Sequence, residues 1–334
     1  MTIFRWGECS LHSIKQSLQS FRLPDDWRSR QEWLTTAHRA ARLLRRDVAH
    51  ATPQQIRLAI EMASRLNPGP WGGEFQVVRT ERWRGAVVTW KGLAEGTVVW
   101  IHGGAFAFGS PRVYRAAATH LARVTKCRVV LPSYRLAPEH PFPQAHEDVF
   151  AALAHWVDKG DSLVVMGDSA GGNLVASGVH RLLQAEASKT EALKGVALLS
   201  PWCDLRPDAL SVVQNQIDHS PFDNEDAMTY AEAYLKDHNP SDPMVSPGLE
   251  AFDGRWPATY MEWAEDEFLA PDIKAWSEAM NRQGVQTTER VEPSAVHGWQ
   301  LLPDLLPEAV RSSEALGAWI RARLGLASPP VQTH

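Results

Sequence analysis

A serine between two glycines lies where an apolar run gives way to a helix-forming stretch. Leu163-Val164-Val165-Met166 leads into Gly167-Asp168-Ser169-Ala170-Gly171. A serine at such a strand-to-helix turn, a nucleophile elbow, stands clear of the backbone, and the flanking glycines relieve crowding at strained dihedral angles. The amide of Ala170 would point at the oxygen of an attacked carbonyl. The pattern predicts Ser169 as a nucleophile, although by itself it also fits a glycine-rich turn with an incidental serine.

A glycine pair follows a second apolar run. Val98-Val99-Trp100-Ile101 is succeeded by His102-Gly103-Gly104. Residues without side chains let backbone N–H groups approach a ligand oxygen closely. We therefore expect the amides of Gly103 and Gly104 to form an oxyanion hole with that of Ala170, and we interpret the histidine as a structural residue of this loop. Two such motifs in this order, each at a strand end, favour catalysis over two tight turns.

A serine nucleophile needs a general base with a pKa near neutrality, which directs attention to the thirteen histidines. Along a chain with a nucleophile elbow the order is serine, acid, histidine, so the base should follow the last predicted strand. His297 does so, and only His334 lies beyond it. The acid that orients the imidazole should follow the preceding strand. There the chain offers four carboxylates, namely Glu265, Asp266, Glu267 and Asp272.

Strands that alternate with helices from about residue 74 would position these groups. The expected strands are short apolar or β-branched runs, typical of a sheet covered by helices on both faces. They span residues 74–80, 86–90, 97–101, 128–132, 163–166, 196–199, 258–263 and 287–291. Helical spacing is expected over 114–124 and 145–157. The alternation predicts an α/β fold with an eight-stranded, mostly parallel sheet flanked by helices.

Two stretches interrupt this alternation, and neither is suited to a core of its own. The pattern in residues 1–70 predicts helices only, and residues 203–255 are rich in Asp, Pro and Asn around a helical run at 226–235. We expect these segments to form a helical cap. The catalytic core would then comprise residues 71–202 and 256–327.

Composition argues against several other classes of protein. In 334 residues, 44% hydrophobic and 22% charged residues are typical of globular proteins, and a net charge of −5 with mixed signs gives no reason to expect a nucleic-acid partner. The three cysteines lack zinc-site spacing. Neither a membrane-spanning run nor a signal peptide is apparent. We expect a cytoplasmic protein that needs no metal or other cofactor.

These motifs resemble the signatures of a known family. The segments His102-Gly103-Gly104-Ala105-Phe106 and Gly167-Asp168-Ser169-Ala170-Gly171-Gly172-Asn173 are similar to those of the hormone-sensitive-lipase family of α/β-hydrolases, the bacterial family IV esterases. Residues 134–143 and 200–205 are similar to its secondary motifs. The resemblance covers about residues 75–320. It implies an α/β-hydrolase fold and the hydrolysis of small-molecule carboxylic esters through an acyl-enzyme intermediate.

The resemblance also bears on the acid. The family pattern has an aspartate two residues before a leucine, with a second acidic residue shortly after. Alignment on Leu269 puts Glu267 at the first position and Asp272 near the second, so Glu267 is favoured and Asp266 is the alternative. Since dimers are common in the family, a homodimer stays open. An amidase or formamidase would use the same triad; a non-catalytic receptor would usually have lost a member of it.

Other side chains near the motifs complete the expectations. An apolar pocket of modest size, suited to short and medium acyl chains, would be lined by Phe106, Phe108, Trp202 and Phe222 together with cap residues such as Phe21 and Trp33. Asp168 should stabilise the turn before the nucleophile. Buried ion pairs and turn contacts that brace the catalytic loops are expected from Arg135, Glu139, Asp148 and Asp204.

Overall fold

A computed structural model describes residues 52–327, except 66, 68, 186–189, 212–223, 253 and 294. Within this part of the chain, eight strands form one sheet in the order β1-β2-β4-β3-β5-β6-β7-β8. The strands are β1 Gly73–Arg79, β2 Arg84–Trp90, β3 Thr97–Ile101, β4 Arg128–Ser133, β5 Leu163–Asp168, β6 Leu193–Leu199, β7 Thr259–Ala264 and β8 Thr287–Glu292. Only β2 pairs antiparallel, with β1 and β4. The predicted fold class is therefore confirmed.

The central strands are apolar on both faces. All five residues of β3 are buried. Val99 and Ile101 belong to one hydrophobic cluster and Val98 and Trp100 to another, because successive side chains of a strand point to opposite sides of the sheet. Each face of the sheet therefore needs its own layer of helices.

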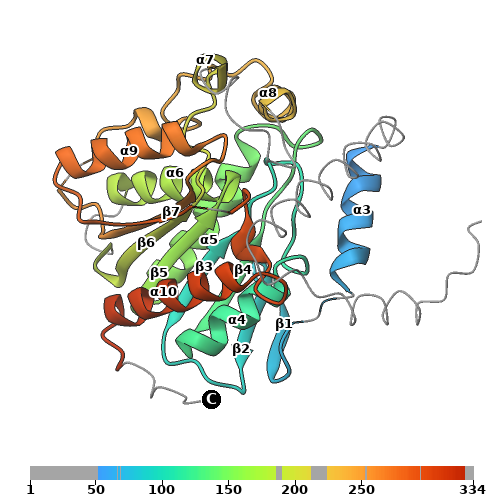
Figure 1. Cartoon of the computed structure of the whole chain (residues 1–334), viewed down its shortest axis with the longest axis vertical. Helices are drawn as coiled ribbons and strands as arrows, with labels where there is room; N and C mark the ends of the chain where they lie inside the picture. The colour runs from blue at the N-terminus through green and yellow to red at the C-terminus, as the bar shows by residue number, and fades with distance from the viewer. Residues whose placement is uncertain are drawn as a thin grey trace, which may run out of the picture.

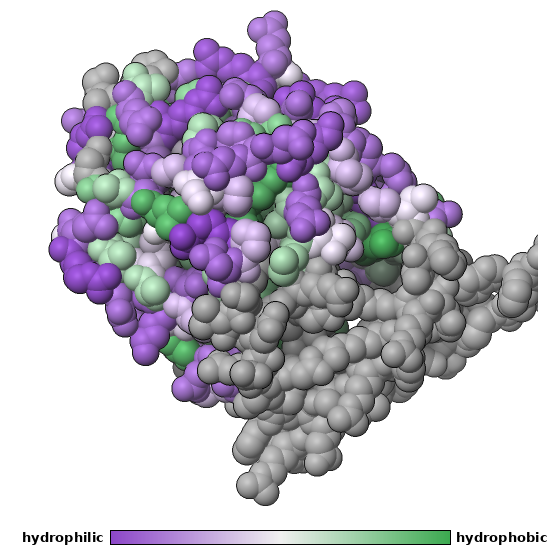
Figure 2. Space-filling view, turned by 90° about the horizontal axis from the view of Figure 1, so that it is seen from above, coloured by the Kyte–Doolittle hydropathy of each residue, from purple (hydrophilic) through white to green (hydrophobic). Residues whose placement is uncertain are grey.

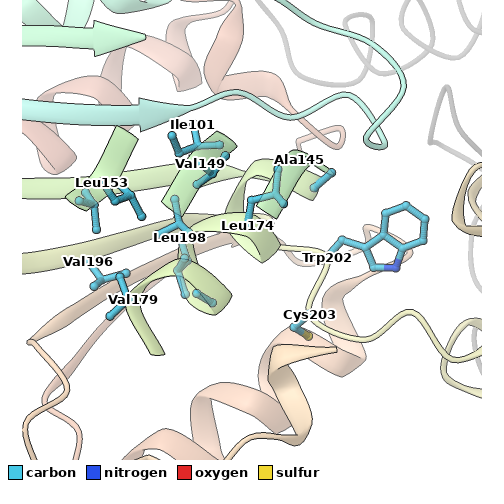
Figure 3. Packing of buried hydrophobic residues seen from close by; sticks show 14 of the residues in the cluster. Ile101, Ala145, Val149, Leu153, Leu174, Val179, Val196, Leu198, Trp202 and Cys203 are labelled. Carbon is cyan, nitrogen blue, oxygen red and sulfur yellow. The ribbon is translucent and has the colours of Figure 1, made fainter. Parts of the chain in front are cut away.

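Two groups of helices supply these layers (Figure 1). One face is covered by α5 Gln144–Asp158, α6 Ala170–Ala185 and α9 Ala270–Arg282, and the other by α4 Arg115–Thr125 and α10 Pro307–Arg323. Figure 3 shows how Val149 and Leu153 from α5 meet Leu174 from α6 beside Ile101 and Leu198 of the sheet. Because the elbow serine immediately precedes α6, this packing fixes the turn that carries it.

Parts of the predicted cap segments lie within the described residues. They contain the helices α3 Pro53–Ser64, α7 Pro207–Ser211 and α8 Asn224–Leu235, and the 3₁₀ turn η2 Pro247–Leu249. The other 3₁₀ turns are η1 Thr190–Ala192 and η3 Trp299–Leu301. A capping box between Thr52 and Gln55, with Pro53 in the first turn, begins α3. The division of the chain into core and cap stays a prediction.

Arg57 makes several polar contacts between α3 and the core, and Gln54 of the same helix also donates to Glu139. Arg57 donates from Nε to the Ala107 carbonyl at 2.7 Å and from Nη2 to the Ala137 carbonyl at 2.5 Å. Its guanidinium also pairs with Glu139 at 2.8 Å. The helix has no fully buried residue, so these polar contacts carry much of its attachment.

The surface seen from above in Figure 2 is largely hydrophilic where residues are coloured, with hydrophobic residues scattered among them. Such a mixture is ordinary for a globular protein. In the described part of the chain, no helix combines the length and apolarity needed to cross a membrane.

Candidate active site

Ser169 lies in the tight turn between β5 and α6. Its φ is +51°, in the left-handed region that non-glycine residues rarely adopt. Its amide donates to the Leu199 carbonyl of β6 at 2.9 Å. A Cβ at Gly167 would come within 2.3 Å of the Gly171 carbonyl oxygen, and one at Gly171 within 2.2 Å of the Ile101 carbonyl oxygen. The turn therefore admits no side chain at either glycine, which explains the motif.

His297 bridges the serine and a carboxylate. Its Nε2 lies 3.0 Å from Ser169 Oγ, and its Nδ1 lies 3.1 Å from Glu267 Oε2. Since an ionised carboxylate only accepts hydrogen bonds, Nδ1 carries the proton and Nε2 is left to accept the serine proton. Ser169, Glu267 and His297 follow β5, β7 and β8 respectively. The carboxyl ends of parallel strands meet at one edge of the sheet, and this topology brings the three residues together.

The structure distinguishes among the four candidate carboxylates. Glu267 is only 4% exposed, whereas Glu265 and Asp266 point into solvent. Asp272 lies in the first turn of α9 near Asp204, where burial, together with the Asp204 charge, raises its pKa to about 6. Only Glu267 has a hydrogen bond with His297.

The oxyanion loop differs from expectation at one amide. Gly103 N–H donates to the Tyr114 hydroxyl at 2.8 Å, so this amide is not free to bind an oxyanion as we expected. Among the described residues, the amides of Gly104 and Ala170 donate to no protein group. Gly104 lines the cavity in front of Ser169, and Ala170 is the fully buried first residue of α6. Two of the three expected donors are thus free.

Tyr114 is a residue that the motifs did not point to. Its hydroxyl donates to Asp168 Oδ2 at 2.6 Å while it accepts from Gly103. Trp100 Nε1 donates to the other oxygen, Asp168 Oδ1, at 2.9 Å. Burial raises the pKa of Asp168 to about 6, although these donors oppose the shift. Asp168 was expected to stabilise the turn, and its partners there are the side chains of Tyr114 and Trp100. No spacing in the sequence indicated these partners.

His102 has the surroundings of a structural residue. Its ring stacks on Tyr134 with centroids 4.2 Å apart, and its Nδ1 lies 2.9 Å from the Gly103 carbonyl oxygen. Burial lowers its pKa to about 4, so the ring is neutral at pH 7. The hydrogen bond that a general base makes with Ser169 belongs to His297 instead.

A cavity of about 310 Å³ opens over Ser169 and His297. Phe108 and Trp202 line it as expected, and further apolar lining comes from Ile60, Val113, Ala227, Phe268, Leu301 and Leu302. Phe106 is a correction: it is fully buried and is not part of the lining. Its ring stacks on Tyr234 with centroids 3.9 Å apart and packs against the lining residue Trp202. The left-handed backbone at Ala105 and Phe106 accompanies this placement. Phe21, Trp33 and Phe222 lie outside the described residues.

The polar residues of the secondary motifs form ion pairs. Arg135 pairs with Asp148 at 2.8 Å, and Asp204 with Arg206 at 2.7 Å. Glu139, expected in a buried pair, is exposed and holds Arg57 of α3. This pair could not be predicted, because Arg57 lies in the N-terminal segment, which matches no motif.

The geometry agrees with what comparisons with known proteins show. A family model described as the α/β-hydrolase fold matches residues 98–301. An esterase of Acinetobacter venetianus is 31% identical over 261 residues, 77% of this chain and 85% of the relative. An acetyl-hydrolase of Streptomyces hygroscopicus is 30% identical over 232 residues, 69% of this chain and 76% of the relative. A crystal structure of an esterase from the bacterial hormone-sensitive lipase family superposes with a TM-score of 0.77 at 26% identity, covering 86% of this chain and 98% of the other.

Proposed function

This chain belongs to the α/β-hydrolase fold family, in its hormone-sensitive-lipase group of carboxylic ester hydrolases, and we therefore propose that Ser169 is the nucleophile of a serine carboxylesterase. The observation that carries the proposal is the hydrogen-bonded series from Glu267 through His297 to Ser169, at the floor of an apolar cavity. This is the arrangement that activates a serine hydroxyl.

The reaction would proceed in two halves. His297 Nε2 takes the proton of Ser169 as Oγ attacks the ester carbonyl, while Glu267 stabilises the imidazolium. The amides of Gly104 and Ala170 donate to the oxyanion. His297 returns the proton to the leaving alkoxide, and an acyl-enzyme remains. A water then gives a proton to His297 and attacks the acyl carbonyl, and His297 passes that proton to Ser169 Oγ as the carboxylic acid leaves.

The cavity favours uncharged substrates with short or medium acyl chains. Among its described lining residues there is neither lysine nor arginine, so an anionic substituent would find no counter-ion. A volume of about 310 Å³ lies at the small end of ligand pockets. Rates on a series of p-nitrophenyl esters should peak between acetate and octanoate. A maximum at palmitate would contradict this chain-length preference.

The role of Ser169 is tested by replacement. Ser169→Ala should lower kcat on p-nitrophenyl butyrate by at least about 10⁴-fold, because the attacking oxygen is removed. Circular dichroism should be unchanged. A fluorophosphonate should label the wild type and not the variant. Near-normal turnover by Ser169→Ala would refute the mechanism, and matched ester and amide substrates would measure whether amides are also cleaved.

A further inference from the structure

A tyrosine hydroxyl connects the two motifs of the active site. Tyr114 is only 3% exposed and lies just before α4, while its partners Asp168 and Gly103 belong to the elbow and the oxyanion loop. A phenol has one proton, and the carboxylate can only accept. The proton therefore goes to Asp168 Oδ2, and the phenol oxygen accepts from Gly103 N–H.

The surroundings fix this hydroxyl in place. The Tyr114 ring meets Trp100 edge-on, at 5.4 Å between centroids and 88° between planes. Trp100 in turn donates to Asp168, so one carboxylate collects both side chains. Burial and the Asp168 charge raise the pKa of Tyr114 well above its ordinary value, and it keeps its proton at every pH at which the enzyme would work. Above the pKa of about 6 that burial gives Asp168, the carboxylate is ionised and accepts this proton.

The Gly104 amide, a free hydrogen-bond donor, follows Gly103 directly along the chain. Gly104 is in the left-handed region with φ +110°, and its amide donates to no described protein group. A Cβ at Gly103 would lie 2.5 Å from Asp168 Oδ2 and 3.1 Å from Ser169 Cβ, so the loop runs directly against the elbow. Any movement of Gly103 moves the Gly104 amide relative to Ser169.

We propose that Tyr114 is a positioning residue of the oxyanion hole, whose hydroxyl ties the Gly103 amide to Asp168 and so sets the Gly104 amide at its distance from Ser169. This inference rests on the proposed function. It assigns Tyr114 no contact with the reacting atoms. Loss of its hydroxyl should therefore slow steps in which negative charge develops and leave ground-state binding nearly unchanged.

The test is Tyr114→Phe, which keeps the ring and removes the hydroxyl. We expect kcat on p-nitrophenyl butyrate to fall about 10- to 100-fold, less than the 10²- to 10³-fold typical of losing a donor outright, with KM within about twofold. Fluorophosphonate labelling of Ser169 should slow by a similar factor. Tyr260→Phe, a buried tyrosine of β7, is the matched control and should leave both rates unchanged. A kcat for folded Tyr114→Phe within twofold of wild type would overturn the proposal.

A second variant tests the same link from its other end. Asp168→Asn keeps the side-chain volume but offers one acceptor to two donors, so kcat should also fall. If both residues act through one contact, the double variant should lose less than the product of the single losses. If the losses of the two single variants multiplied in the double variant, the proposal would be refuted. If Tyr114→Phe did not fold, an unchanged kcat in Asp168→Asn would refute it instead. Failure of the proposed function itself is separately visible, as activity that survives Ser169→Ala.

Discussion

The carboxylate of Glu267 is almost fully buried. The residue is 4% exposed, Oε2 faces His297 Nδ1, and Oε1 has no hydrogen-bond partner among the described residues. A carboxylate placed in this way holds the imidazole through its Nδ1–H, so that Nε2 faces Ser169. Asp266, one residue earlier in the same turn, points into solvent and has no such effect.

A substitution that removes the charge of Glu267 but keeps its side-chain volume should show whether Glu267 or Asp266 is the acid. Glu267→Gln retains the volume but no longer stabilises the imidazolium, and it permits the wrong tautomer of His297. We expect kcat/KM on p-nitrophenyl butyrate to fall about 10³- to 10⁴-fold. Asp266→Asn is the matched control and should stay within about twofold of wild type. If the larger loss appeared in Asp266→Asn, the assignment of the acid would be wrong.

The choice between these neighbours shows a limit of sequence reasoning. Adjacent residues in a turn project in different directions, and only the path of the backbone after β7 decides which of them meets His297. Ser169 and His297 were predictable because strand-to-loop order constrains them. The hydroxyl of Tyr114 was not, because its partner Gly103 is eleven residues away and its partner Asp168 is much farther along the chain.

Among the elements, α3 is attached in a way that its sequence does not reveal. Its described side chains include the exposed Leu58 and Met62, and Ile60 reaches the cavity. A twelve-residue helix is marginally stable alone in water, so tertiary contacts must hold it. The contacts of Arg57 with Ala107 and with the chain near Glu139 serve this purpose.

Removing the guanidinium should loosen this one helix. For Arg57→Met we expect about 2 kcal/mol less local stability, typical of lost charge-assisted hydrogen bonds, and hence about 30-fold faster amide exchange over residues 53–64. KM should rise because Ile60 no longer closes the cavity. Arg65→Met, at the exposed C-terminal end of the helix, should change neither quantity. Equal exchange rates in both variants would show that Arg57 does not anchor α3.

The sheet was predicted more completely than the loops. Continuously apolar runs such as Val98 to Ile101 have few alternatives to a strand buried on both faces. The observed β6 begins at Leu193, three residues before the expected start, beside an irregularity where it pairs with β5. Phe106 packs on Tyr234 and is not among the cavity lining, and residue type alone predicts neither this placement nor its left-handed backbone.

At the scale of the whole molecule, buried titratable groups act on stability in opposite directions. Burial lowers the pKa of His102 and His146 from 6.5 to about 4. Their contribution to the free energy of unfolding is complete above pH 6.5 and is lost as the pH falls toward 4. Burial raises the pKa of Asp168 and Asp272 from 3.8 to about 6, so their contribution grows as the pH falls through the same interval. The two pairs partly offset each other.

Replacing one histidine should expose this balance. His146, in α5, has its Nδ1 2.6 Å from the Tyr234 hydroxyl of α8, so His146→Gln should be less stable than wild type at pH 7. Glutamine cannot be protonated, so between pH 7 and pH 4.5 the deficit should shrink by about 2 kcal/mol. Urea unfolding at both pH values measures it. His140→Gln, at an exposed position, is the control for the loss of a histidine side chain. A deficit for His146→Gln that grew on acidification would mean that the folded protein accepts a proton at His146 more readily than the unfolded chain does, which is incompatible with its burial between α5 and α8.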